Sequence, residues 1–253
     1  MLSQFIWSAS IALEVFLLAR GLQQKLTHKY PIFYSYIAYV LAQEFVSLGI
    51  YYWNQRVYRY TYWLTEFVGV LIGCGVVFEI CRIGLAAYPG TARMARRLLA
   101  ILFAIASVKA LIEAANDPRW WLQASAVDVE AALRAVQGLA IISLVALFLF
   151  YSIPFGRNLR GILLGYGLFV CWSVICLTYA SDAVDRANSV WAYTSSASYM
   201  VALALWCGHL WSYQANPQPK RFVHLEQDYQ RVAAATQRRL HDARAYVAKA
   251  VGS

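Results

Sequence analysis

Seven long apolar runs dominate this sequence and restrict what it can fold into. A helix needs roughly 20 consecutive apolar residues to cross the hydrocarbon core of a membrane. Only 14% of the residues are charged, whereas an average globular protein has about 25%. We therefore expect an all-α integral membrane protein with seven transmembrane helices, at Leu2–Ala19, Phe33–Trp53, Thr61–Cys81, Leu98–Ala115, Val129–Ile153, Gly161–Ala180 and Val190–Tyr213.

Lys and Arg are distributed unequally between the loops on the two sides of these runs. The loops after the first, third and fifth runs hold nine, the three opposite loops hold four, and the segment after the last run holds seven. Cytoplasmic loops carry the excess of Lys and Arg in membrane proteins. The N-terminus is therefore expected outside and the C-terminus in the cytoplasm.

The segment YYWNQRVYRYTYW, Tyr51–Trp63, is unusually aromatic and bridges two runs on the expected outer side. Tyr and Trp prefer the headgroup region, which favours an aromatic belt in contact with membrane lipids. An outward-facing ligand pocket is the alternative, because seven rings exceed what anchoring requires. Nucleic acid is not an expected partner on an extracytoplasmic face. The outer aromatic surface comprises Tyr51, Tyr52, Trp53, Tyr58, Tyr60, Tyr62, Trp63, Trp120 and Trp121.

Charged residues inside apolar runs are functional candidates, because a charge in a membrane is costly and needs a partner. Lys109 lies four residues before Glu113, and Glu130 lies four before Arg134, so each pair shares a helical face and is interpreted as a rim ion pair. The candidates are Glu14, Glu44, Glu66, Glu79, Lys109, Glu113 and Arg134.

Three of the carboxylates differ in their surroundings. Glu66 is level with both Lys109 and Arg134 and is expected to pair with either. Glu79 is three residues before Arg82 and needs no special role. Glu44 lies near the middle of the second run with no basic residue nearby, which favours a neutral acid hydrogen-bonded to another helix, with a proton or cation site as the alternative.

Two GxxxG patterns indicate close helix packing. Gly69 and Gly73 lie in the third run, and Gly161 and Gly165 lie in the sixth. Small residues four apart let helix backbones approach closely in lipid. Packing inside the bundle is the favoured interpretation, and a face that joins protomers is the alternative.

The chain divides into a transmembrane domain, 1–213, and a tail, 214–253. After Pro219, large apolar residues at Phe222, Leu225, Tyr229 and Val232 begin a stripe along one helical face. This pattern predicts a cytoplasmic amphipathic helix, because the segment is too polar to span a membrane. It would self-associate, dock a cytoplasmic partner or lie on an anionic leaflet.

Enzymatic and cofactor signatures are lacking in the sequence. The five cysteines have no C-x-x-C spacing, and only His209 of the four histidines lies in an apolar run, which argues against a metal site and a self-contained haem site. H-E-x-x-H, G-x-S-x-G and P-loop patterns do not occur. We therefore expect no cofactor, no metal and no catalytic residue.

Two resemblances to known families follow from short motifs. RYTYWL, with Arg59, Tyr60 and Trp63, resembles the third helix of microbial rhodopsins, but Val190–Tyr213 has no lysine to form a retinal Schiff base. The combination of YWLTEF, FEI and YPG, at Tyr62–Phe67, Phe78–Ile80 and Tyr88–Gly90, resembles a group of uncharacterised bacterial seven-span proteins. That resemblance implies a bacterial inner-membrane protein and no particular activity.

These observations favour a non-enzymatic membrane protein of sensor or receptor type. It is expected to bind a lipid or small apolar ligand at its aromatic outer side and to couple through its C-terminal helix to a partner. One alternative is an oligomeric assembly subunit of a membrane complex. Another is a proton-coupled transporter built on Glu44 and Glu66.

Overall fold

Seven long α-helices and one short 3₁₀-helix carry most of the residues that the structure describes. The computed structural model of the chain describes residues 2–53, 55–116, 124–150, 156–182, 185–217, 227 and 230–239. Each apolar run of the sequence lies mainly within one of these helices. The elements are α1 Leu2–Gln23, η1 Leu26–His28, α2 Pro31–Trp53, α3 Gln55–Gly84, α4 Pro89–Asn116, α5 Ala124–Phe150, α6 Arg157–Asp182 and α7 Asp185–His209.

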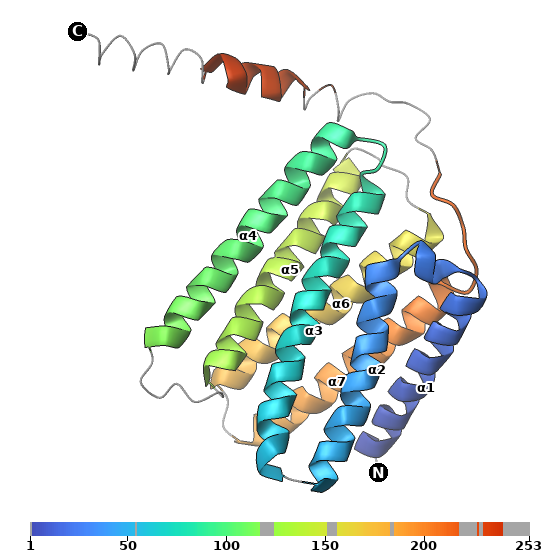
Figure 1. Cartoon of the computed structure of the whole chain (residues 1–253), viewed down its shortest axis with the longest axis vertical. Coiled ribbons are helices and arrows are strands. Elements are labelled where there is room, and N and C mark those ends of the chain that lie inside the picture. Colours follow the sequence, from blue (N-terminus) through green and yellow to red (C-terminus); the bar gives the residue numbers. More distant parts are fainter. Residues whose placement is uncertain are drawn as a thin grey trace.

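The helices form one bundle in which sequence neighbours are also spatial neighbours (Figure 1). Helix α1 packs against both α2 and α7, so the first and last helices of the bundle are in contact. Helix α3 contacts α2, α4, α5 and α6 and is therefore central to the packing. Helix α4 packs on α3 and α5 and lies at the edge of the bundle (Figure 1).

The distribution of polarity identifies a membrane protein. Four helices are long and apolar enough to cross a membrane, through the segments Ile6–Gln23, Leu64–Gly84, Glu130–Phe150 and Arg157–Cys176. Large apolar side chains are exposed on the outside, among them Phe45, Leu64, Ile105, Leu149 and Phe150. Charged and amide side chains are buried inside, among them Glu14, Glu79, Glu130, Arg134, Gln137 and Asn158. This arrangement suits a lipid environment, where polar groups are satisfied within the bundle.

Proline begins two of the helices, and a carboxylate from another helix completes one of these ends. Pro31 and Pro89 are the first residues of α2 and α4, positions where a missing N–H removes no helical hydrogen bond. The backbone N–H groups of Ile32 and Phe33 donate to the Glu79 carboxylate at 3.1 and 2.8 Å. Glu79 of α3 therefore caps the N-terminus of α2, a role beyond the proximity to Arg82 that its sequence position indicates.

The glycines of α6 allow a close approach to α7. A Cβ atom at Gly161 would collide with Cβ of His209, and one at Gly165 would collide with the Trp206 ring. The Trp206 indole N–H donates to the Ile162 carbonyl at 3.4 Å. Helices α6 and α7 thus approach closely at Gly161 and Gly165, where a larger residue would collide with α7.

The glycines of α3 also face other helices of the same chain. A Cβ at Gly69 would lie 3.4 Å from the ring of Tyr39 in α2. A Cβ at Gly73 would collide with the hydroxyl of Tyr166 in α6. All four glycines of the two GxxxG patterns therefore lie at contacts inside the bundle.

The tail is described in part. Residues 230–239 are helical, and Val232 is 61% exposed. The other three residues expected to make tail contacts, Phe222, Leu225 and Tyr229, lie outside the described residues.

We predict that Gly161→Ala lowers the thermal stability of the purified protein, because the new methyl group has to displace the backbone of α7. Overpacking of this kind costs typically about 1–3 kcal/mol. Gly208→Ala is the matched control, since a Cβ there meets nothing within 4 Å. Melting temperatures in detergent measure both variants. Equal melting temperatures for the two variants would contradict the close approach of α6 and α7.

Candidate functional site

A buried arginine joins two carboxylates in the interior of the bundle. Arg134 of α5 is 7% exposed. Its Nη2 lies 2.5 Å from Oε1 of Glu66 in α3, and its Nε lies 2.6 Å from Oε1 of Glu130, one turn earlier in α5. We call these three residues the Arg134 cluster. The Glu130–Arg134 pair is therefore not a rim pair, because both side chains are buried and a third charge from another helix completes the group.

Amide and hydroxyl groups extend the Arg134 cluster to two more helices. Gln43 of α2 donates to Oε2 of Glu66 at 3.1 Å. Gln137 of α5 donates to the Val70 carbonyl of α3 at 2.8 Å and accepts from the Tyr166 hydroxyl of α6 at 3.2 Å. Helices α2, α3, α5 and α6 are thus joined by polar contacts that lipid cannot replace.

A second polar group lies between α1, α2 and α7. Glu14 of α1 is 0% exposed, and the Tyr199 hydroxyl of α7 donates to its Oε1 at 2.6 Å. Glu44 of α2 interacts electrostatically with Glu14. Within the described part of the chain, Oε2 of Glu14 and Oε2 of Glu44 are both buried and have no hydrogen-bond partner. Two carboxyl groups, one on α1 and one on α2, therefore lie near enough to interact electrostatically, and each has a buried oxygen without a partner in the described part of the chain.

The aromatic ring of Phe169 contacts both polar groups. The ring of Phe169 in α6 lies 5.2 Å from the ring of Tyr199, between centroids. The Arg134 guanidinium carbon lies 5.1 Å from the centroid of the same Phe169 ring, a cation–π contact. The two groups consequently share Phe169, which connects α5 to α7 through α6.

The end of α7 is held by the first turn of α6. The Asn158 side-chain amide of α6 donates to the His209 carbonyl at 3.2 Å and to the Ser212 carbonyl at 2.9 Å. Its oxygen accepts from the Gln214 backbone N–H at 2.6 Å. Asn158 therefore satisfies backbone groups that the end of a helix leaves unpaired. Helix α7 ends at His209 rather than at Tyr213, the end of the apolar run, because the chain turns onto Asn158.

Helix α1 and the turn after it also contact the chain that follows α7. We call residues 210–217 the exit segment. Arg20 of α1 donates to the Trp211 carbonyl at 2.9 Å, and its guanidinium carbon lies 4.4 Å from the Trp211 ring centroid. Lys29 Nζ lies 5.5 Å from the ring centroid of Tyr213. The exit segment is therefore attached to both α1 and α6 before the tail begins.

A tyrosine at this end of the bundle remains uncharged. Burial raises the pKa of the Tyr30 hydroxyl to about 12, and the neighbouring Tyr213 and Glu79 act in the same direction. Tyr30 is therefore protonated throughout the physiological pH range. The cations Arg20 and Lys29 accordingly supply the charge next to the exit segment.

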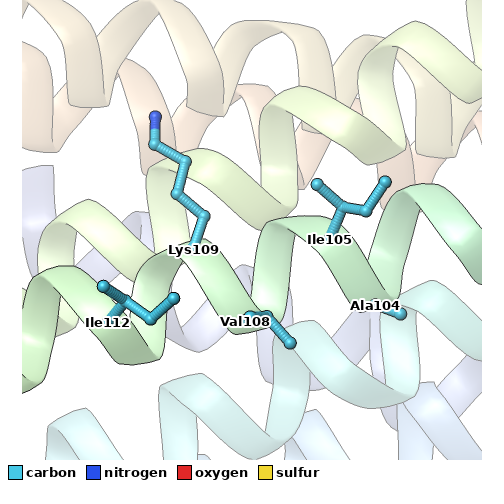
Figure 2. Close-up of a pocket in the computed structure, with 5 residues that line it drawn as sticks. All are labelled: Ala104, Ile105, Val108, Lys109 and Ile112. Atoms are coloured by element: carbon cyan, nitrogen blue, oxygen red, sulfur yellow. The ribbon is translucent and has the colours of Figure 1, made fainter.

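Lys109, another candidate from the sequence, lies on the exposed surface of α4. Lys109 extends from the edge helix α4 and lines a shallow, mostly apolar depression of about 480 Å³ (Figure 2). One helix alone forms this depression, so we assign it to the lipid-facing surface; its lining residues are Ala104, Ile105, Val108, Lys109 and Ile112.

Several candidates lie wholly or partly outside the described residues. Glu113 and the aromatic residues Tyr51, Tyr52, Trp53, Tyr58, Tyr60, Tyr62 and Trp63 have helical backbones, but their side chains are not described, and Trp120 and Trp121 lie outside the described residues. In the described ranges, no three His, Cys, Asp or Glu side chains are grouped to hold a metal ion.

Sequence reasoning found the charges of this site but missed the uncharged residues that complete it. Gln43, Gln137, Asn158, Tyr166 and Tyr199 all take part. An amide inside or at the edge of an apolar run is itself a signal, because its polar atoms need partners in lipid. Gln43 directly precedes Glu44, and Gln137 follows Arg134 by three residues, so both were within reach of that argument.

The chain matches no protein-family model, no curated protein and no solved structure. The interpretation of its function therefore rests on the arrangement of its own residues.

Proposed function

We propose that the chain is a non-enzymatic sensor or receptor of a bacterial inner membrane, with seven spans and a cytoplasmic C-terminus. It binds a lipid or small apolar ligand at its aromatic outer side and couples this binding through α7 to the tail. The resemblance of the sequence to bacterial seven-span proteins supports the seven spans and the bacterial inner membrane, and it implies no particular activity. The lipid or ligand contacts belong to the Tyr51–Trp63 segment, and the coupling contacts belong to α7 and the exit segment.

The attachment of the exit segment is the observation that supports this proposal best. A tail that merely follows the last helix needs no contacts with the bundle. Here Asn158 bonds three backbone groups between His209 and Gln214, and Arg20 bonds the Trp211 carbonyl. A movement of α1, α6 or α7 is thereby passed to the residues that lead into the tail.

Two further observations bear on the alternative functions. The four glycines of the GxxxG patterns pack against α2, α6 and α7 of the same chain, which removes one reason to assign them to protomer contacts. Helices α1 to α7 are each continuous over their described lengths, whereas transporters typically place their sites at broken helices. Both observations favour a sensor over an assembly subunit or a transporter.

Seven spans and an outside N-terminus place the α1–η1 turn in the cytoplasm and the α2–α3 turn outside. We predict that a membrane-impermeant maleimide added to intact cells labels Asn54→Cys but not Gln24→Cys. The unmodified chain, with its five native cysteines, measures the background. The opposite labelling pattern would show that the orientation is reversed. Labelling at both positions would show that the two turns lie on the same side of the membrane, so that α2 does not span it.

Coupling is tested by a change in the bundle that is read out in the tail. We predict that Tyr199→Phe shifts the emission of an environment-sensitive fluorescent amino acid placed at Ala234, because it removes a contact between α1 and α7. The shift should shrink in Tyr199→Phe/Asn158→Ala, where α6 loses three of its hydrogen bonds to the segment from His209 to Gln214. Ser143→Ala is the matched control, since it removes a hydroxyl from the exposed face of α5. An unchanged emission in Tyr199→Phe would refute coupling through α7.

A further inference from the structure

We propose that Glu14 and Glu44 together bind a proton in the middle of the bundle, between α1, α2 and α7. Both carboxyl groups lie near the middle of their helices, and Tyr199 lies near the middle of α7. The proposal goes beyond the sensor function and does not depend on it, because it concerns the bundle alone. It assigns the proton-binding role to Glu14 with Glu44, and Glu66 belongs to the Arg134 cluster instead.

The geometry of the two carboxyl groups calls for a proton. Glu14 is 0% exposed, and only its Oε1 is bonded, to the Tyr199 hydroxyl. Oε2 of Glu14 and Oε2 of Glu44 are buried and have no partner among the described residues. A buried polar atom left unpaired costs about 1–3 kcal/mol, and more when it is charged. One proton removes one of the two interacting negative charges and gives its carboxyl group an O–H donor.

A metal cation fits this place poorly. A hard cation such as Ca²⁺ takes about 6–8 oxygen ligands. The described part of the site supplies two carboxyl groups and one hydroxyl, and that hydroxyl already donates its hydrogen to Glu14. A proton needs only one carboxyl oxygen to bind to, and Glu14 and Glu44 each offer a buried oxygen without a partner among the described residues.

The other titratable groups around Glu14 do not supply the missing charge. Helix α7 contributes Tyr199 and Cys207, whose thiol contacts the Leu13 carbonyl at 3.8 Å. Helix α2 contributes Glu44 and Tyr36.

Basic residues are present on neighbouring elements but are placed elsewhere. In and beside η1, His28, Lys25 and Lys29 lie at the end of α1, away from the middle of the bundle. Arg134 is ion-paired with Glu66 and Glu130 beyond the Phe169 ring. A proton taken from water is therefore the cation that neutralises the pair.

Infrared spectroscopy of the full-length chain in lipid nanodiscs tests the proposal. Exposed Asp and Glu side chains are ionised at neutral pH, so a carboxylic-acid C=O band there marks a buried proton. We expect this band in the wild type, with a shift to lower wavenumber in D₂O. Glu14→Gln and Glu44→Gln should each abolish it. Glu226→Gln in the tail is the matched control and should leave it unchanged.

Tyr199→Phe provides a second test that keeps both carboxyl groups. Loss of the hydrogen bond to Glu14 should move the C=O band to higher wavenumber. If a Gln variant does not fold, this shift tests whether Glu14 carries the proton. The proposal is overturned if the wild type has no such band at neutral pH, if the band survives both Gln variants, or if Tyr199→Phe leaves it unshifted. A band that follows Na⁺ or K⁺ concentration at constant pH would likewise overturn it.

Discussion

The burial of one arginine between two glutamates is the interaction on which the packing of this bundle depends. Arg134 cannot leave Glu66 and Glu130 without exposing three charges to an apolar interior, because these carboxylates are the charged groups in short contact with it among the described residues. This requirement fixes the separation and rotation of α3 relative to α5. Gln43 and the Gln137–Tyr166 pair then place α2 and α6 around the same centre. Apolar packing alone is weakly specific in lipid, so polar contacts select the neighbours.

From this centre a chain of contacts leads to the end of the bundle that carries the tail. Phe169 contacts both Arg134 and Tyr199, and Tyr199 bonds Glu14 of α1. Helix α1 then contacts the exit segment directly after α7, where Arg20 and Trp211 meet. Helix α1 is thus connected both to α7 and to the exit segment. This double connection gives a physical basis for transmission from the bundle to the tail.

The helices and some of their ends were predictable from local sequence, whereas their partners were not. Apolar runs such as Phe33–Trp53 predict α2 because helix formation depends on neighbouring residues, and Pro31 and Pro89 begin helices for the same local reason. Lys109 and Arg134 are both expected at the depth of Glu66, and nothing in the local sequence indicates that Arg134 is its partner. Glu79 caps a helix that begins 48 residues earlier in the chain, at Pro31. Such pairings depend on how each helix is rotated about its axis, which periodicity in an all-apolar helix does not reveal.

The end of α7 shows the same limit. The apolar run of the sequence continues to Tyr213, but helix α7 ends at His209. It ends there because the side chain of Asn158, which is far away in the sequence, binds the carbonyls of His209 and Ser212. The candidate site was therefore predictable in its charges, Glu14, Glu44, Glu66 and Arg134. It was not predictable in the division of these charges into a cluster around one arginine and a carboxyl pair that has no basic partner among the described residues.

The free energy of unfolding of Arg134 variants in a bilayer tests the role of the Arg134 cluster most directly. Arg134→Met should lose about 3–5 kcal/mol, because it leaves the buried Glu130 and the half-buried Glu66 without their cation. The triple variant Arg134→Met/Glu66→Gln/Glu130→Gln removes all three charges and should recover most of that loss. A single variant as stable as the wild type, or a triple variant no more stable than the single one, would contradict the claim that this ion cluster holds the bundle together.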